Sequence, residues 1–343
     1  MAIGVYIGRF QPFHNDHLRT VKHALERVEK LVIVVGSSRQ ARTVKNPWTV
    51  LEREEMIQAC LSTTELERVS VEHSMDYLYN DNMWITSVQE LLSYHIDDDA
   101  DDVILFGHKK DASSFYLKLF PHWDFCETGA WSSLDASHVR DLYFQHDLIG
   151  VEKLVPSQVY DRLYDDAINP ASPFQFTKLK EEYDHLREYR RRWEHAPYPP
   201  TFVTVDAVVV CSGHVLVVRR RAAPGKGLLA LPGGFLNPRE RIVDGAIREL
   251  KEETAIKLTP QELTSMIVDE RVFDHPDRSL RGRTITHAVC VNVNQKQSKL
   301  PQVKGMDDAD KAFWLPLSDV FAREEEFFED HASIIRYFTS RDF

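Results

Sequence analysis

The sequence predicts an α/β protein of two domains, with an open parallel sheet in its first half and a mixed α/β fold in its second. Short β-branched runs alternate with helical patterns up to about residue 144, and this pattern changes after residue 150. At 343 residues, the chain is also longer than one hydrophobic core usually serves. We therefore expect a first domain over 1–150, a helical linker region over 151–200 and a second domain over 201–343.

The elements of the first domain follow from periodicity. Ile3–Ile7 and Leu31–Val35 are β-branched runs on either side of a helical pattern, which predicts a βαβ unit and a parallel sheet. Further strands are expected at Val69–Glu72 and Val103–Phe106, with helical stretches between them. This alternation favours a Rossmann-like sheet, in which ligands bind beyond the carboxyl ends of the strands.

Helices and a hairpin are expected next. Pro156–Ile168 and Phe174–Trp193 have helical patterns, and three prolines between 197 and 200 then interrupt the chain. Phe202–Val210 and Val215–Arg219, joined by Ser212-Gly213, predict a β-hairpin that opens the second domain.

Composition limits the class of partner. The net charge of −11 and the pI near 5.8 argue against general binding to nucleic acid or to an anionic membrane, but small phosphate-rich substrates stay open. The four cysteines contain no C-x-x-C pair, which favours free thiols in a reducing cytosol. The sequence contains neither a signal-peptide pattern nor an apolar run of membrane-spanning length, so we expect a cytoplasmic protein, and a homo-oligomer is compatible with the sequence.

The segment GRFQPFHNDH (8–17) follows the first strand and opens the first helix. A helix N-terminus favours anionic phosphate, and His14 and His17 can both donate hydrogen bonds to one triphosphate there. Such donors stabilise charge that develops on a transferring phosphorus, so no protein nucleophile is needed. The alternative is that both histidines serve only as helix caps or surface residues.

This segment resembles the H-x-G-H nucleotidyltransferases, and GRFQPFH is typical of nicotinamide-nucleotide adenylyltransferases, including the bifunctional type. The resemblance implies ATP and nicotinamide mononucleotide (NMN) as substrates, with His14 and His17 catalytic. It places Gly8, Arg9 and Phe10 at the substrate. Asp16 stands where the family has Gly, so either Asp16 points away as a helix cap or transferase activity is weakened.

A second family signature corresponds to residues 135–140, where Ser137 and Arg140 keep the matching chemistry and Ala136 replaces a hydroxyl residue. By resemblance, Arg140 grips the ATP phosphates with its planar guanidinium. The same resemblance gives roles to four residues elsewhere in the first domain. Arg53 would meet the mononucleotide phosphate, Trp84 would stack on nicotinamide or pack in the core, and Gly107 and Lys109 would line the site.

In the second domain, Glu249, Glu252 and Glu253 crowd one face of a predicted helix, because they stand at i, i+3 and i+4. Apolar residues occupy the opposite face. An anchored helix with clustered carboxylates suits a hard divalent cation beside a phosphate. The alternative is a solvated acidic helix with an Arg248–Glu252 pair.

The stretch Gly234–Ile256 resembles the Nudix box, GX5EX7REUXEEXGU, and departs from it only at Ala255, where the family has Gly. The resemblance implies a C-terminal Nudix α/β/α domain that uses Mg²⁺ or Mn²⁺. The implied metal ligands are Glu249, Glu253, Glu252 and the carbonyl of Gly233, with Glu252 and Glu253 also counted as catalytic. Arg248 would orient a carboxylate. The candidates for the general base are Glu270, Asp307, Asp308 and Asp310.

The basic loop with Arg281 and Arg283 is similar to a segment of ADP-ribose pyrophosphatases fused to this adenylyltransferase. A solubilising turn is the simpler interpretation. Taken together, the resemblances imply a bifunctional enzyme of NAD metabolism that joins NMN to ATP and splits ADP-ribose into AMP and ribose 5-phosphate. Two alternatives stay open: a Nudix hydrolase with a catalytically weak, nucleotide-sensing first domain, and a Nudix domain acting on NADH, a dinucleoside polyphosphate or a flavin dinucleotide.

Overall fold

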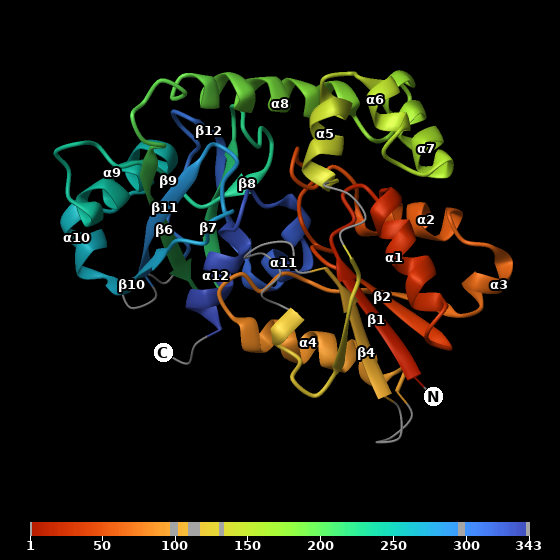
Figure 1. The fold of residues 1–343 in the computed structure, drawn as a ribbon. Helices are drawn as coiled ribbons and strands as arrows, with labels where there is room; N and C mark the ends of the chain where they lie inside the picture. The colour runs from red at the N-terminus through yellow and green to blue at the C-terminus, as the bar shows by residue number, and fades with distance from the viewer. Residues whose placement is uncertain (1, 97–101, 109–116, 130–133, 294–298, 341–343) are drawn as a thin grey trace. The chain divides into compact units, whose positions relative to one another are not determined.

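The computed structural model describes residues 2–96, 102–108, 117–129, 134–293 and 299–340. The chain forms two compact units, Met1–Glu181 and Glu182–Phe343. The division lies within the segment 151–200 that the sequence assigned to a linker region. The expected fold class, an α/β chain with a parallel first sheet and a mixed second sheet, is confirmed (Figure 1).

The first unit is built on a parallel sheet with strand order β3-β2-β1-β4-β5. The chain runs outward from β1 to β3 and then returns to β4, so the order reverses between β1 and β4. Ligands bind at such a reversal, beyond the carboxyl ends of the strands. Its elements are β1 (Ala2–Gly8), α1 (Asn15–Leu25), β2 (Lys30–Val35), α2 (Val50–Ala59), α3 (Thr63–Leu66), β3 (Val69–His73), α4 (Asp81–Ser93), β4 (Asp102–Gly107), β5 (Asp124–Glu127), α5 (Ala136–Phe144), α6 (Leu148–Glu152), α7 (Ser157–Ile168) and the start of α8 (Phe176–Arg191).

Helices cover both faces of this sheet. Ile3, Val5 and Ile7 alternate along β1 and join one core cluster with Val88 and Leu92 of α4. Figure 1 shows α1 and α2 on the other face. Burial on both faces explains why β1 and β2 appear in the sequence as continuous apolar runs.

The second unit has a mixed sheet with the order β10-β11-β6-β7-β12, in which β8 pairs with β7 and β9 with β6. The expected hairpin is present: it turns at Ser212 and Gly213, both with positive φ, and pairs Cys211 with His214. The elements are β6 (Thr201–Cys211), β7 (His214–Arg220), β8 (Leu229–Ala230), β9 (Gly233–Phe235), α9 (Ile242–Thr254), α10 (Pro260–Ser265), β10 (Ile267–Phe273), β11 (Arg283–Asn292), β12 (Ala309–Pro316), α11 (Leu317–Ala322), the 3₁₀ turn η2 (Glu324–Glu326) and α12 (His331–Thr339).

The helix α9 packs on β6 through its apolar face. Ala246, Ile247 and Leu250 share a core cluster with Val205 and Val209. The predicted two-faced helix is therefore present, and this packing fixes which way its carboxylates point.

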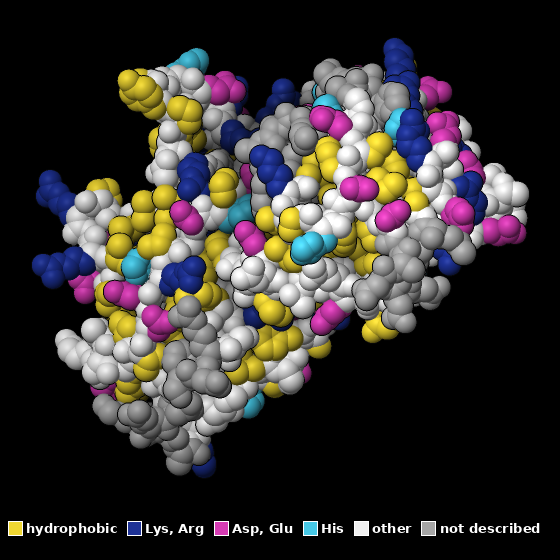
Figure 2. Space-filling model, turned by 60° about the horizontal axis from the view of Figure 1, so that its bottom comes forward, with side chains coloured by type: hydrophobic (Ala, Val, Ile, Leu, Met, Phe, Trp, Pro, Cys, Tyr) yellow, Lys and Arg dark blue, Asp and Glu magenta, His cyan; other side chains and the backbone are white. Residues whose placement is uncertain are grey.

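No helix in the described parts of the chain is long and apolar enough to cross a membrane. On the face drawn in Figure 2, Lys and Arg side chains are interspersed among Asp and Glu side chains instead of forming one basic patch.

Candidate active sites

The first candidate site begins where β1 ends. Gly8 is its last residue, and a side chain there would meet the ring of Phe10, since an added Cβ lies 2.8 Å from a ring carbon. Phe10 has a φ of 51° and is buried, with its ring edge-on to Tyr6 and to His17. The glycine and the left-handed turn together bring the chain from the strand to the start of α1.

Arg53, which lies on α2, holds in place the loop between β1 and α1. Its Nη1 atom donates to the carbonyls of Arg9 and Gly36 at 2.6 Å each, and Nη2 donates to the carbonyl of Ser37 at 3.0 Å. These carbonyls follow the ends of β1 and β2. Arg53 is 1% exposed, and burial lowers its pKa to about 10. The contacts give Arg53 a positioning role, and its predicted contact with the mononucleotide phosphate stays a prediction.

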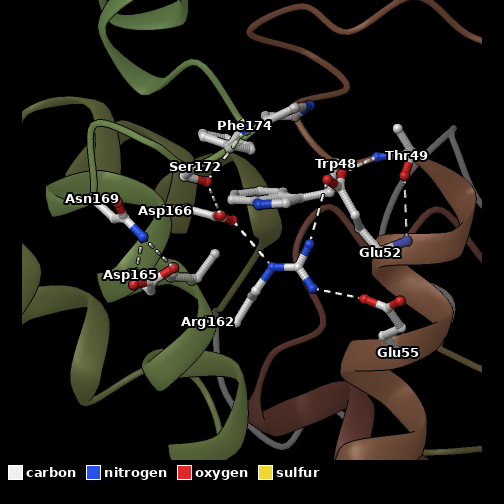
Figure 3. A network of polar contacts seen from close by, with 12 residues as sticks. Trp48, Thr49, Glu52, Glu55, Arg162, Asp165, Asp166, Asn169, Ser172 and Phe174 are labelled. Carbon is white, nitrogen blue, oxygen red and sulfur yellow. Dashed lines mark hydrogen bonds and ion pairs between the residues drawn. The ribbon is translucent and has the colours of Figure 1, made fainter.

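A network of ion pairs anchors the helix that carries Arg53 (Figure 3). Arg162 of α7 approaches Glu55 at 2.7 Å, Glu52 at 3.4 Å and Asp166 at 3.4 Å. Glu52 also closes a capping box at the start of α2. The helix α7, which the sequence placed in a linker, therefore braces the first candidate site.

Gln11 joins the loop to two other segments. Its side-chain amide donates to the carbonyl of Trp48 at 2.8 Å and accepts from the Trp48 N–H at 3.0 Å. Its own carbonyl accepts from Nη1 of Arg140 at 2.6 Å. Arg140 also donates to the hydroxyl of Ser137 at 3.1 Å, so the two residues of the second signature lie together.

Positive charge concentrates at this loop. Burial, and then the nearby charge of Arg9, lower the pKa of Arg140 to about 10, and Arg9 also lowers the pKa of Arg53. Arg9 thus disfavours the charged form of both buried guanidinium groups, whereas Asp76 beside Arg53 and Asp141 beside Arg140 favour it, and a bound polyanion would favour it further. The geometry therefore fits a triphosphate.

His14 and His17 form a reciprocal helix cap. The backbone N–H of His17 donates to Nδ1 of His14 at 3.4 Å, and the N–H of His14 donates to Nδ1 of His17 at 3.2 Å. The rings stack with centroids 3.5 Å apart. Because each Nδ1 accepts, a neutral ring carries its proton on Nε2. Burial, and then His14, lower the pKa of His17 well below its ordinary value.

Capping and catalysis, which the sequence presented as alternatives, are therefore compatible for this pair. In each ring, Nδ1 accepts the capping hydrogen bond, which selects the tautomer that carries its proton on Nε2. The Nε2–H group is therefore the hydrogen-bond donor of each ring. A phosphate oxygen needs such donors.

The remaining residues of the first site have mixed surroundings. The Asp16 carboxylate, at the second position of α1, accepts from Arg19 at 3.2 Å. Trp84 is half-buried and packs 5.8 Å from Phe120, as the core alternative expects. Gly107 ends β4 where an added Cβ would lie 2.7 Å from Leu117. Lys109 lies outside the described residues.

The second candidate site begins at β9. A Cβ on Gly233 would lie 2.3 Å from a carboxylate oxygen of Asp206, and one on Gly234 would lie 2.5 Å from a carboxylate oxygen of Glu249. The N–H of Gly233 donates to Glu253 at 3.0 Å. The two glycines therefore let the turn approach the acidic face of α9, and the role of the Gly233 carbonyl as a metal ligand stays a prediction.

The two predicted principal ligands are partly desolvated. Burial raises the pKa of Glu253 to about 8, and the charges of Glu249 and Asp206 act in the same direction. Burial also raises the pKa of Glu249. Glu252 is more exposed. Buried like charges of this kind are stabilised by a cation.

Arg248 organises the box. It contacts Glu240 through two bonds of 2.7 and 2.9 Å, and it donates to Glu249 and to Glu252 at 2.9 Å each. Its fifth bond, at 3.4 Å, reaches the carbonyl of Phe235. Arg248 therefore holds three carboxylates of the box, and its role in orienting metal ligands stays a prediction.

The residues fit a divalent cation by their chemistry. Among the described residues, no three His, Cys, Asp or Glu side chains stand close enough to hold a metal as they are. Glu249 and Glu253 nevertheless interact electrostatically beside the glycine turn, and carboxylate oxygens are the ligands that Mg²⁺ and Mn²⁺ prefer.

Two arginines lie near the turn, and the sequence singled out only one of them. The Arg281 guanidinium lies 5.2 Å from the ring centre of Phe235 and 3.7 Å from Glu329. The guanidinium of Arg220, a residue that sequence reasoning missed, lies 4.1 Å from the ring centre of Phe328. Its positive charge acts to lower the pKa of Glu253, against the larger effect of burial. The run of arginines at the end of β7 was the available signal.

The other predicted residues are more peripheral. Arg283 donates to the carbonyl of Asp274. Glu270 lies on β10, with 53% of its side chain exposed and 3.2 Å from His287. Asp307, Asp308 and Asp310 are exposed. Their loop is held to the end of α9, since the N–H of Met306 donates to the carbonyl of Glu253 at 3.0 Å, which keeps this acidic run beside the box.

At the C-cap of α9, Ala255 has φ 46° and ψ 30°. The sequence departs from the family at a position that adopts the left-handed conformation, where glycine is favoured.

Comparisons with known proteins agree with both sites. The Cytidylyltransferase-like family matches residues 5–116, and the NUDIX domain family matches residues 200–338. The nicotinamide/nicotinic acid mononucleotide adenylyltransferase of Acinetobacter baylyi is 39% identical over 42% of this chain and 77% of its own length. Nicotinamide-nucleotide adenylyltransferase 1 of Sulfolobus acidocaldarius is 39% identical over 51% of this chain and 98% of its own length.

Two solved structures of one protein match this chain across both units. The crystal structure of a bifunctional NMN adenylyltransferase/ADP ribose pyrophosphatase from Francisella tularensis is 35% identical, with a TM-score of 0.91, and covers 99% of each chain. A second structure of that protein, in complex with AMP and a manganese ion, gives a TM-score of 0.89 at 34% identity over 99% of this chain and 98% of that one. With a transferase loop in one unit and a Nudix box in the other, the chain belongs to the family of bifunctional NMN adenylyltransferases/ADP-ribose pyrophosphatases.

Proposed function

We propose that the first unit transfers the adenylyl group of ATP to NMN and that the second unit hydrolyses ADP-ribose to AMP and ribose 5-phosphate. The observation that carries the first activity is the paired cap that keeps His14 and His17 as Nε2–H donors, in the same loop whose Gln11 carbonyl accepts from Arg140. The box geometry around Arg248 carries the second.

In the transferase reaction, a phosphate oxygen of NMN bonds to the α-phosphorus of ATP, and the bond from that phosphorus to the bridging oxygen breaks to release pyrophosphate. No protein group becomes covalently attached. His14 and His17 donate to oxygens on which charge develops, and Arg140 holds the triphosphate in line. Arg53 and Gln11 keep the loop in the geometry that these contacts require.

In the hydrolysis, the oxygen of water bonds to one phosphorus of the diphosphate, and the bridging P–O bond breaks. A bound Mg²⁺ or Mn²⁺ supplies charge neutralisation and lowers the pKa of water. Glu249 and Glu253, with Glu252, would hold the ion. Arg248 orients these carboxylates, and a carboxylate outside the box, from Glu270 or from the acidic run 307–310, would take the proton from water.

The experiment is to assay both reactions on the full chain. We expect NAD formation from NMN and ATP, and AMP formation from ADP-ribose that a chelator abolishes. A substrate panel with NADH, a dinucleoside polyphosphate and a flavin dinucleotide tests the hydrolase assignment by kcat/KM. Faster turnover of any of these than of ADP-ribose would contradict the proposed substrate, and a silent first unit would favour the sensor alternative that Asp16 and Ala136 raise.

A further inference from the structure

A cavity of about 340 Å³ opens in the second unit, outside the Nudix box. One side comes from the end of α8 and the chain that follows it, including Arg190, Trp193 and Glu194. The other side comes from Phe202 at the start of β6 and from the loop of Arg281 and Arg283. All of these residues lie within Glu182–Phe343.

A short chain of contacts links the cavity to the hydrolase site. The Phe202 ring meets the Phe235 ring edge-on, with centroids 5.9 Å apart. The carbonyl of Phe235 accepts from Arg248, and the Arg281 guanidinium lies over the Phe235 ring. One aromatic side chain therefore separates the cavity from the residue that orients the box carboxylates.

The lining has the chemistry of a nucleobase site. Trp193 meets Phe202 edge-on, with centroids 5.4 Å apart, and 42% of Trp193 is exposed. Aromatic faces and planar guanidinium groups stack on bases, whereas a ribose offers no π face. Three arginines and the carboxylate of Glu194 line the cavity; Glu329, 3.7 Å from Arg281, and Asp274, 3.9 Å from Arg283, offset part of this positive charge, which still suits an anionic nucleotide. The volume lies in the range of small-ligand pockets, about 300–1,000 Å³.

We propose that this cavity holds the adenine ring of the substrate while the diphosphate lies at the box. This inference rests on the proposed hydrolase function and adds the base-recognition site to it. The segment 190–200, which the sequence assigned to a linker, then belongs to the hydrolase. Trp193 becomes a residue that determines affinity for the base, and Arg281 lies between the base and the diphosphate.

The test compares Trp193→Ala with the wild type in ADP-ribose hydrolysis by the full chain. Stacking on an aromatic side chain is worth about 1–3 kcal/mol per base, so we expect the KM to rise about 5- to 150-fold. The kcat should stay nearly constant, because the base contact is the same in the ground state and the transition state. Trp193→Phe should keep most of the affinity, because it retains an aromatic face.

The matched control is Tyr198→Ala. Tyr198 is an aromatic residue of the same segment, 81% exposed, and does not line the cavity, so its removal should leave the KM unchanged. If the wild type hydrolyses ADP-ribose and Trp193→Ala changes the KM less than about twofold, the base site is overturned and the proposed function stands.

A binding measurement keeps the base site testable if ADP-ribose proves a poor substrate. AMP should quench the fluorescence of the wild type more than that of Trp193→Phe, and ribose 5-phosphate should give no such difference. The comparison isolates Trp193 from the other tryptophans among the six in the chain. Equal quenching of both proteins by AMP would overturn the base site. Failure of ADP-ribose hydrolysis with a positive quenching difference would overturn only the assigned substrate.

Discussion

Replacing Arg248 with Gln tests whether the Nudix box works through orientation or through charge. Arg248 donates to Glu249 and to Glu252 at 2.9 Å each, and its side chain is 27% exposed. A hydrogen bond to a charged group is worth about 1.5–3 kcal/mol when buried, and partial exposure reduces this to about 1 kcal/mol. Loss of both bonds removes about 2 kcal/mol of the free energy that holds the two carboxylates in their metal-binding arrangement. This loss corresponds to about a 30-fold decrease in metal affinity.

The assay is ADP-ribose hydrolysis as a function of Mg²⁺ concentration. We expect Arg248→Gln to raise the half-saturating concentration about 10- to 100-fold and to leave NAD synthesis unchanged. If Arg248 acted only through its positive charge, the opposite result would be expected, because removing that charge from beside the site should tighten metal binding.

The control is Arg241→Gln, which removes an exposed positive charge from the start of the same helix, where the side chain makes no capping hydrogen bond. An unchanged or leftward-shifted Mg²⁺ curve for Arg248→Gln would refute the orienting role.

Three further predictions concern the first unit and the end of α9. Ala255→Gly should raise the calorimetric unfolding temperature by about 1–4 °C, because relief of left-handed strain, about 1–2 kcal/mol, exceeds the entropy cost of glycine. Ala222→Gly, in an exposed loop without positive φ, should not stabilise, and equal shifts would refute the strain argument. His17→Ala loses the Nε2–H donor together with the Nδ1 capping acceptor, so NAD synthesis should fall about 10²–10³-fold. Because the folded pKa of His17 is lowered, its contribution to stability is complete above the unfolded value of 6.5 and is lost as the pH falls below it, by about 1.4 kcal/mol per unit. The unfolding temperature of His17→Ala should therefore decline less steeply below that pH, and a decline parallel to that of the wild type would count against the buried neutral ring. Asp16→Gly should raise the kcat/KM for ATP and lower the unfolding temperature, because it removes both a negative charge near phosphate and the pair with Arg19; no kinetic gain would show that this carboxylate does not oppose ATP.

Local spacing made the principal elements and the box predictable. Ile3–Ile7 is apolar throughout because helices cover both faces of the sheet, and that pattern is visible in the sequence. The acidic and apolar faces of α9 follow from the helical period alone. The reversal of strand order between β1 and β4 was not predicted, because parallel strands alone do not fix the order in which they pair.

Contacts between distant residues could not be read from the sequence. Gln11 and Trp48 are far apart in the chain, and their pairing depends on how two loops pack. The ring of Phe174 stacks on Trp48 at 5.5 Å, which draws the segment after α7 into the first unit. The strand β10, with residues of both charges and alternate burial, depends on pairing with β11 and lacks a strong apolar signal of its own.

Glu253→Gln is the most direct test of two independent sites on one chain. Both reactions should be measured on one preparation of this variant at saturating Mg²⁺. We predict that release of AMP from ADP-ribose falls to background while the rate of NAD formation equals that of the unaltered protein. Retained hydrolysis, or a matching loss of both rates in a protein that stays folded, would contradict the account.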